Sequence, residues 1–131
     1  MKKTGLLNSH VSTAIAQMGH LDTLVVADAG LPAPTGAWRI DLALRPGVPA
    51  FLDVVDAILS ELHIERAIVA AELAQVSPQL WGALQSRLGG VVIEQVPHDE
   101  FKRRSADARA IVRSGEFTPY ANVILVSGVV F

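Results

Sequence analysis

Two histidines and one aspartate lie at points where the chain passes between apolar segments. Asp28 directly follows the apolar run 24–27, His98 follows a proline at the end of another apolar run, and His20 precedes the first run. Imidazole exchanges protons near neutral pH because its pKa lies close to working pH. A carboxylate accepts hydrogen bonds from hydroxyl groups. These residue types can transfer protons and bind hydroxyl groups, but none of them specifies a reaction by itself.

Each of these residues also has a simpler explanation. His20 follows a glycine and could cap the end of a preceding helix by pairing with its last carbonyl groups. Asp28 could form an Asx turn, and His98 could be a loop histidine beside a helix start. His10 and His63 are expected to be solvated. The spacing of the histidines does not match a zinc motif such as H-E-x-x-H, so no metal site is predicted.

A turn-rich segment over residues 113–122 contains Gly, Pro, Thr and Asn, and places Tyr120 and Asn122 just before the last apolar run. A sugar needs hydrogen-bond partners for its hydroxyl groups and a flat apolar wall for its C–H face. A phenol ring and an amide supply both. An ordinary surface turn would have a similar composition, so both interpretations stay open.

Length and charge narrow the classes of function. The chain has 131 residues and a mass of 14.0 kDa, which predicts a single domain over 1–131. A net charge of −2 gives no excess of positive charge that would bind the phosphates of a nucleic acid. The sequence contains no cysteine, which excludes disulfides and thiolate metal sites. Neither G-x-G-x-x-G nor a Walker lysine motif is present, so no nucleotide cofactor is expected.

The composition is apolar for a globular domain. Hydrophobic residues make up 50% of the chain and charged residues 18%, and the mean hydropathy is +0.37. Runs such as 123–126 are far shorter than the roughly 20 residues that span a bilayer, so we expect no membrane segment. No signal-peptide-like stretch follows Lys2 and Lys3, which predicts a cytoplasmic protein. The excess of apolar surface, including the tail 128–131, predicts a homo-oligomer.

Helical and strand-like periods alternate along the chain. We expect helices over 8–19 (capped by Asn8 or Ser9 and ended by Gly19), 49–62, 77–88 and 99–109, and strands over 23–27, 38–44, 64–71, 91–96, 110–113 and 121–126. This order predicts a single three-layer α/β domain, with a central, mostly parallel or mixed sheet and helices on both faces. In such sheets ligands bind beyond the carboxyl ends of the strands. Asp28 and His98 are expected at two of these ends.

Many short motifs fall in the order seen in one known family. They are Gly19-His20-x-Asp22-Thr23-Leu24-Val25-Val26, Asp28-Ala29-Gly30-Leu31-Pro32, Arg39-Ile40-Asp41, Gly47-Val48-Pro49, Pro97-His98, Ile111-Val112-Arg113-Ser114-Gly115-Glu116 and Pro119-Tyr120-Ala121-Asn122. With these motifs the chain from Lys2 to Phe131 resembles the D-ribose pyranase family, the RbsD/FucU group of sugar mutarotases. The stretch from Gln75 to Gln95 matches only in outline.

The resemblance implies an isomerase that interconverts the pyranose and furanose forms of D-ribose without a cofactor. It implies that His20 is the general acid and that the sugar is held by Asp28, His98, Tyr120, Ala121 and Asn122, with Lys102 as a looser correspondence. It further implies rings of five subunits, often paired into decamers, with the sugar cleft between neighbours. Gly30-Leu31 and Ala121 favour the ribose branch of the family over the fucose branch.

The chemistry agrees with these residue types. A cyclic hemiacetal opens when a proton leaves the anomeric hydroxyl and another reaches the ring oxygen, and the open aldehyde is then recaptured by a different hydroxyl. Two alternatives remain open. One is a non-catalytic ribose-binding or regulatory subunit accessory to ribose uptake, in which His20 would only donate a hydrogen bond. The other is an L-fucose-type mutarotase.

Overall fold

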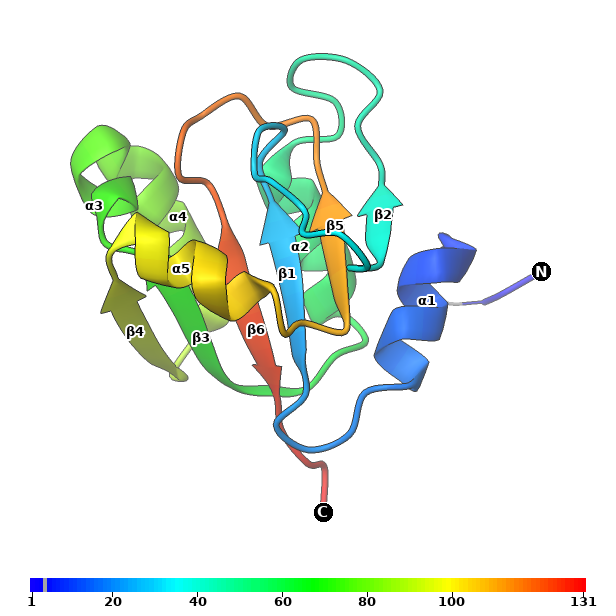
Figure 1. Cartoon of the computed structure of the whole chain (residues 1–131). Coiled ribbons are helices and arrows are strands. Elements are labelled where there is room, and N and C mark those ends of the chain that lie inside the picture. The colour runs from blue at the N-terminus through cyan, green and yellow to red at the C-terminus, as the bar shows by residue number, and fades with distance from the viewer. Residues whose placement is uncertain (4) are drawn as a thin grey trace.

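The computed structural model describes residues 1–3 and 5–131, and within them the strands form a six-stranded sheet of order β2-β5-β1-β6-β3-β4 (Figure 1). The strands are β1 (Thr23–Ala27), β2 (Arg39–Asp41), β3 (Ile64–Ala70), β4 (Val92–Val96), β5 (Ala110–Arg113) and β6 (Val123–Ser127). Strand β6 is antiparallel to β1 and β3, whereas the other neighbouring pairs are parallel. The mostly parallel, mixed sheet predicted from the sequence is confirmed.

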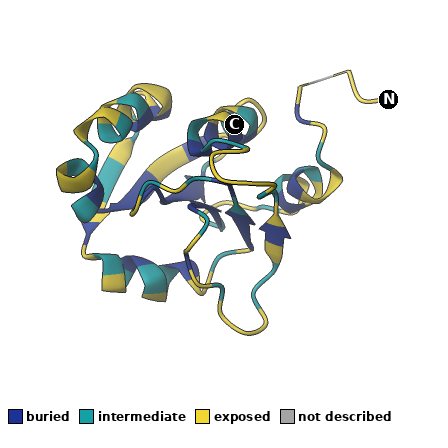
Figure 2. Ribbon diagram, turned by 90° about the horizontal axis from the view of Figure 1, so that it is seen from above, coloured by how far each residue is buried: buried dark blue, intermediate teal, exposed yellow. Residues whose placement is uncertain are grey.

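Helices cover both faces of the sheet (Figure 2). One face carries α1 (Ser9–Ala16), α2 (Phe51–Leu59), α3 (Glu72–Val76) and α4 (Pro78–Leu88), and the other carries α5 (His98–Ser105). The predicted three-layer arrangement is therefore confirmed. Among the described residues no helix is long and apolar enough to cross a membrane.

Strand β1 shows why its sequence is apolar at every position. Leu24 and Val26 belong to the core under α1, α2 and α4, while Val25 and Ala27 belong to the core under α5. Side chains alternate between the two faces of a strand, and here both faces are covered by helices. A continuous apolar run is therefore required, and such a run was the signal that predicted this strand.

Several element boundaries differ from the predicted ones. Asn8 caps α1 as expected, because its Oδ1 accepts from the Val11 N–H at 2.9 Å, but the helix ends at Ala16 and not at Gly19. Strand β2 covers three residues and not the predicted 38–44, because Asp41 Oδ1 accepts from the Ala43 N–H at 3.0 Å and turns the chain. Beyond that turn Leu44, the last residue of the predicted strand, is 79% exposed.

The other helices also begin or end at unexpected residues. Helix α2 starts at Phe51, two residues after the predicted start, and α5 ends at Ser105 instead of 109. The short helix α3 was not predicted. The buried face of α2 is formed by Phe51, Val54, Val55 and Ile58.

The strand directions bring distant segments to one edge of the sheet. Strands β1 and β3 are both antiparallel to β6 and so parallel to each other, and β4 and β5 share their direction. Their carboxyl ends therefore meet at the same edge, where β6 begins. Asp28, His98 and Asn122 all flank this edge, which is where ligands bind in α/β sheets.

Candidate active site

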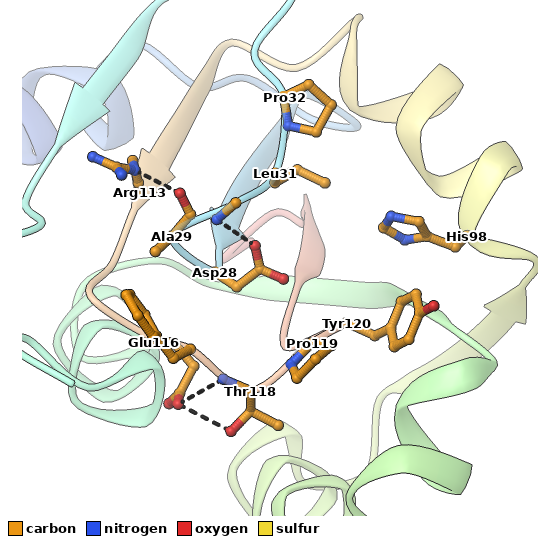
Figure 3. Close-up of a pocket in the computed structure, with 12 residues that line it drawn as sticks. Asp28, Ala29, Leu31, Pro32, His98, Arg113, Glu116, Thr118, Pro119 and Tyr120 are labelled. Carbon is orange, nitrogen blue, oxygen red and sulfur yellow. Dashed lines mark hydrogen bonds between the residues drawn. The ribbon is translucent and has the colours of Figure 1, made fainter. Parts of the chain in front are cut away.

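A cavity of about 570 Å³ opens at this edge of the sheet (Figure 3). Its walls come from the loop after β1, from the start of α5 and from the segment between β5 and β6. The lining residues are Asp28, Ala29, Gly30, Leu31, Pro32, His98, Arg113, Glu116, Phe117, Thr118, Pro119 and Tyr120. Of the predicted sugar contacts, Asp28, His98 and Tyr120 thus lie together in one chain. The volume is in the range of small-molecule sites.

The Asp28 carboxylate is held from two sides. Its Oδ1 accepts from the Gly30 N–H at 2.9 Å, and its Oδ2 accepts from Asn122 Nδ2 at 2.9 Å. Asn122 Oδ1 accepts in turn from the Asp28 N–H at 2.8 Å. The Asx turn considered from the sequence is therefore present, and it exists together with a carboxylate that faces the cavity.

Asn122 and Ala121 are fully buried and do not line the cavity. Both were predicted to contact the sugar. The structure places the Asn122 amide behind Asp28, with its oxygen and nitrogen both bonded to that residue. In this arrangement its side chain positions the carboxylate, while Ala121 packs in the core beside it.

Tyr120 and His98 form the aromatic part of the wall. Their ring centroids are 4.9 Å apart in an edge-to-face arrangement, and the His98 ring also stacks on Phe101 at 6.3 Å. Tyr120 has φ +66°, in the left-handed region that residues other than glycine rarely adopt. Such strain persists where the surrounding structure fixes it, often at functional sites. Here the Asn122 N–H donates to the Tyr120 carbonyl at 2.8 Å.

Glu116 organises the loop that carries Tyr120. Its Oε2 accepts from the Thr118 N–H at 3.3 Å and from the Thr118 hydroxyl at 3.1 Å. Its Oε1 accepts from the Phe51 N–H at 3.3 Å, at the start of α2, where the N-cap residue Ala50 has no polar side chain. The Glu116 carbonyl accepts from the Ala29 N–H at 2.8 Å. No role was predicted for Glu116, because Phe51 and Ala29, two of the residues that it joins, are distant from it in the chain.

Arg113 joins the loop after β1 to the end of β2 at the rim of the cavity. Its Nε donates to the Ala29 carbonyl at 2.9 Å, and one guanidinium nitrogen lies 3.0 Å from Asp41 Oδ2. Burial tends to raise the pKa of Asp41, but the Ala43 N–H and the Arg113 guanidinium together hold that pKa below its ordinary value. The rim therefore carries an ion pair. The sequence placed Arg113 within the turn-rich segment without assigning it a role.

His20 lies at the opposite edge of the sheet and does not line the cavity of its own chain. The simpler interpretation as a helix cap is wrong, because α1 ends four residues earlier, at Ala16. The imidazole Nε2 instead lies 2.9 Å from Glu65 Oε2, at the start of β3, and both side chains are about half exposed. The strand β1 separates His20 from Asp28.

Lys102 also lies outside the cavity lining. It comes one helical turn after His98 on α5, and its Nζ lies 2.8 Å from Asp99 Oδ1. Over residues 1–3 and 5–131, no three His, Cys, Asp or Glu side chains are grouped so that they could hold a metal ion.

A cavity at the carboxyl edge of a mixed α/β sheet, in which carboxylate, imidazole and phenol groups stand among apolar residues, defines a site for a hydroxyl-bearing small molecule. The chain belongs to the RbsD / FucU transport protein family, whose model matches residues 1–130. The family inferred from the motifs is therefore confirmed. Its relatives include the D-ribose pyranases of Symbiobacterium thermophilum and Laribacter hongkongensis, 58% and 53% identical to this chain over 131 residues, with all of both chains covered.

Solved structures agree with this assignment. Bacillus subtilis RbsD complexed with D-ribose is 46% identical to this chain, with a TM-score of 0.97 and full coverage of both chains. A fucose mutarotase from Streptococcus pneumoniae in complex with L-fucose is 26% identical, with a TM-score of 0.79 over 95% of this chain and 94% of that one. The ribose relative is the nearer of these two in both sequence and structure.

Proposed function

We infer that this chain is an isomerase that interconverts the pyranose and furanose forms of D-ribose, as one domain over residues 1–131. The observation that carries this conclusion is the match along the full length to D-ribose pyranases, combined with a cavity in which Asp28, His98 and Tyr120 converge. The function expected from the sequence agrees with these relatives.

The cavity can bind a pentose in a defined orientation. The Asp28 carboxylate is fixed by Gly30 and Asn122 and still has free lone pairs for sugar hydroxyl groups. Leu31 and Phe117 offer apolar surface to the C–H face of the ring, and the Tyr120 hydroxyl adds a donor and acceptor. In this proposal Asp28, His98 and Tyr120 hold the sugar, and Asn122 acts through Asp28.

Ring opening needs a general acid that protonates the ring oxygen, as well as a group that accepts the proton of the anomeric hydroxyl. His20 is the proposed acid. Glu65 accepts a hydrogen bond from its Nε2, which leaves Nδ1 available for a substrate. Positioned proton donors and acceptors contribute about 10²–10⁴-fold. Since the uncatalysed reaction already proceeds in water, an acceleration of this size is sufficient.

His20 can reach a sugar only in the cavity of another subunit, since it lies at the opposite edge from its own. Exposed apolar residues occur next to it in the chain and in the tail 128–131: Leu21 is 55% exposed and Val130 83%, and the Leu21 N–H donates to the Ser127 carbonyl just before the tail. Apolar surface of this kind marks an interface. We therefore propose a homo-oligomer in which His20 of one subunit completes the site of the next. The rings of five, paired into decamers, that the resemblance implies are the proposed form.

We also propose that the protein works in the cytoplasm. A chain without cysteine does not depend on an oxidising compartment for its stability. Lys102 remains a proposed outer contact, because it lies on the same helix face as His98 and its ammonium group can turn away from Asp99.

Exchange spectroscopy by NMR on D-ribose tests the function. We expect the pyranose and furanose anomeric signals to exchange faster at a catalytic protein concentration. Shift changes without faster exchange would identify the alternative of a non-catalytic ribose-binding subunit. The same measurement on L-fucose distinguishes the fucose-type mutarotase, which would accelerate that sugar more than ribose.

A further inference from the structure

Two buried polar atoms beside the cavity have no hydrogen-bond partner within residues 1–3 and 5–131. They are Oε2 of Glu72, the first residue of α3, and Nδ1 of His98, the first residue of α5. Buried polar atoms in proteins are nearly always hydrogen-bonded. A pair of such atoms on two residues in contact therefore calls for an explanation. Glu72 belongs to none of the sequence motifs and has no role in the proposed function.

The two residues are already joined through the backbone. Glu72 Oε1 accepts from the His98 N–H at 3.1 Å. The contact arises because β3 and β4 are parallel neighbours, so that the segments following them run side by side, and the Ala71 N–H donates to the Val96 carbonyl at 2.8 Å. The N-cap residue of α5 is Pro97, which offers no side-chain cap. Glu72 supplies the missing acceptor from another element.

Because Oε1 and Oε2 share one carbon, the second carboxylate oxygen lies near the His98 backbone N–H, on the same residue as the unpaired Nδ1. The ring itself is fixed by Phe101, which stacks on it, and by Tyr120, which meets it edge to face. His98 lines the cavity while its Nδ1 is buried, so that the other ring nitrogen, Nε2, is the one open to the cavity (Figure 3).

We propose that Glu72 is a positioning residue that holds His98 in the Nδ1–H tautomer, so that Nε2 faces the sugar as a proton acceptor. An ionised carboxylate can only accept hydrogen bonds, so when Glu72 Oε2 pairs directly with Nδ1, that nitrogen must be the donor. The other nitrogen of a neutral imidazole is then an acceptor. Carboxylate–histidine pairs fix tautomer and ring orientation in this way at metal sites and catalytic triads.

The role toward the sugar rests on the proposed function. In ring opening the anomeric hydroxyl gives its proton to His98 Nε2, and its oxygen forms the carbonyl. The bond from the anomeric carbon to the ring oxygen breaks, and its electron pair goes to that oxygen, which takes a proton from the acid. The Glu72 carboxylate stabilises the transient positive charge on His98. Closure by a different hydroxyl reverses each transfer.

Glu72→Gln separates the two functions of the carboxylate. The amide oxygen of the variant can still accept from the His98 N–H, but its nitrogen donates, so that Nδ1 becomes the acceptor and the tautomer inverts. Asp99→Asn is the matched control, because it removes an exposed carboxylate from the first turn of α5, next to His98 in the chain. Thermal unfolding of both variants establishes that they are folded.

Ring ¹⁵N signals of the labelled protein at alkaline pH give the decisive readout. His98 is assigned from the signals that His98→Gln lacks. We expect a protonated Nδ1 in the wild type and in Asp99→Asn, a protonated Nε2 in Glu72→Gln, and a kcat for D-ribose about 10–100-fold lower in Glu72→Gln with little change in KM.

A wild-type Nε2–H tautomer would overturn the proposal, as would an E72Q protein with unchanged tautomer or unchanged kcat. The tautomer is measured without sugar. If the wild type does not accelerate ribose exchange, the proposed function fails, while the ring signals still decide whether Glu72 sets the tautomer.

Discussion

Asp28 and Asn122 are bonded to each other twice, although 94 positions separate them in the chain. Asn122 Nδ2 donates to Asp28 Oδ2 at 2.9 Å, and its Oδ1 accepts from the Asp28 N–H at 2.8 Å. The pair joins the end of β1 to the start of β6, which are antiparallel neighbours. A carboxylate fixed in this way presents its remaining lone pairs to the cavity in one orientation.

Exchanging the two side chains distinguishes what the pair contributes to the stability of the fold from what the Asp28 carboxylate contributes to ribose binding. In Asp28→Asn the new amide faces the Asn122 amide, so one hydrogen bond is lost and the stability falls by about 1–3 kcal/mol. In Asp28→Asn/Asn122→Asp every bond of the pair can form again, but the carboxylate now lies behind the cavity wall. We expect the double variant to regain stability in urea unfolding while ribose binding stays weaker by about 1.5–3 kcal/mol in calorimetry.

Asn8→Ala is a control for this experiment, because Asn8 caps α1 far from the cavity. It should cost about 1 kcal/mol of stability and leave ribose affinity unchanged. Unchanged ribose affinity in Asp28→Asn itself would restrict Asp28 to its Asx turn with Gly30.

Removal of the His20 imidazole should abolish most of the exchange enhancement. His20 is half exposed and makes its side-chain hydrogen bond to Glu65, so His20→Ala should leave the fold intact. A general acid contributes about 10²–10⁴-fold, and we expect a loss of that size in ribose exchange measured by NMR. His10→Ala, which also removes an exposed histidine, should retain the wild-type rate. Wild-type exchange in His20→Ala would transfer the acid role to another residue, with His98 the first candidate.

Much of this fold could be predicted because its signals are local. The apolar run of β1 is required by burial on both faces, and Ser77 caps α4 through its own hydroxyl, which accepts from the Leu80 N–H at 3.3 Å. The edge of the sheet where the carboxyl ends of the parallel strands meet follows from strand direction alone. Asp28 and His98 were therefore predicted correctly to lie at strand ends.

The unpredicted features depend on contacts between distant residues. Glu116 and Glu72 cap the helices α2 and α5 from 65 and 26 positions away, because Ala50 and Pro97 cannot. No local pattern marks such an acceptor. His20 was placed beside a helix end because a glycine precedes it, yet its partner is Glu65, 45 positions away.

Acid should remove a stabilising contact in the loop that carries His20. The Gly19 N–H and the Arg109 guanidinium hold the pKa of Asp22 below its ordinary value. A depressed carboxyl pKa contributes stability above the ordinary value of about 3.9, and this contribution is lost as pH falls through the lower pKa of the folded state. At pH 7, Asp22→Asn should therefore be less stable by up to about 1 kcal/mol, since Arg109 is largely exposed.

The difference between wild type and Asp22→Asn in urea unfolding should shrink as the pH falls through the lowered pKa of Asp22 in the folded state, and should vanish once that carboxyl is protonated in both states. Asp107→Asn, on the exposed turn after α5, is the control and should match the wild type throughout. A difference that persists at the lowest pH would show that Asp22 acts through packing and not through its charge.

A shared site predicts that two impaired variants restore activity to each other. His20→Ala retains the cavity residues, and Asp28→Asn retains the proposed acid at the opposite edge. If His20 of one subunit serves the cavity of the next, random mixed assemblies contain intact sites at about one quarter of the interfaces. We expect ribose exchange to recover to about that fraction after the two proteins are dissociated, mixed and reassembled. Each variant reassembled alone should keep its own reduced rate, measured at a ribose concentration below KM, and sedimentation should give the same oligomer mass for all samples. A fully active 14.0 kDa monomer would contradict the shared site directly, and so would mixed assemblies of correct mass that show no recovery.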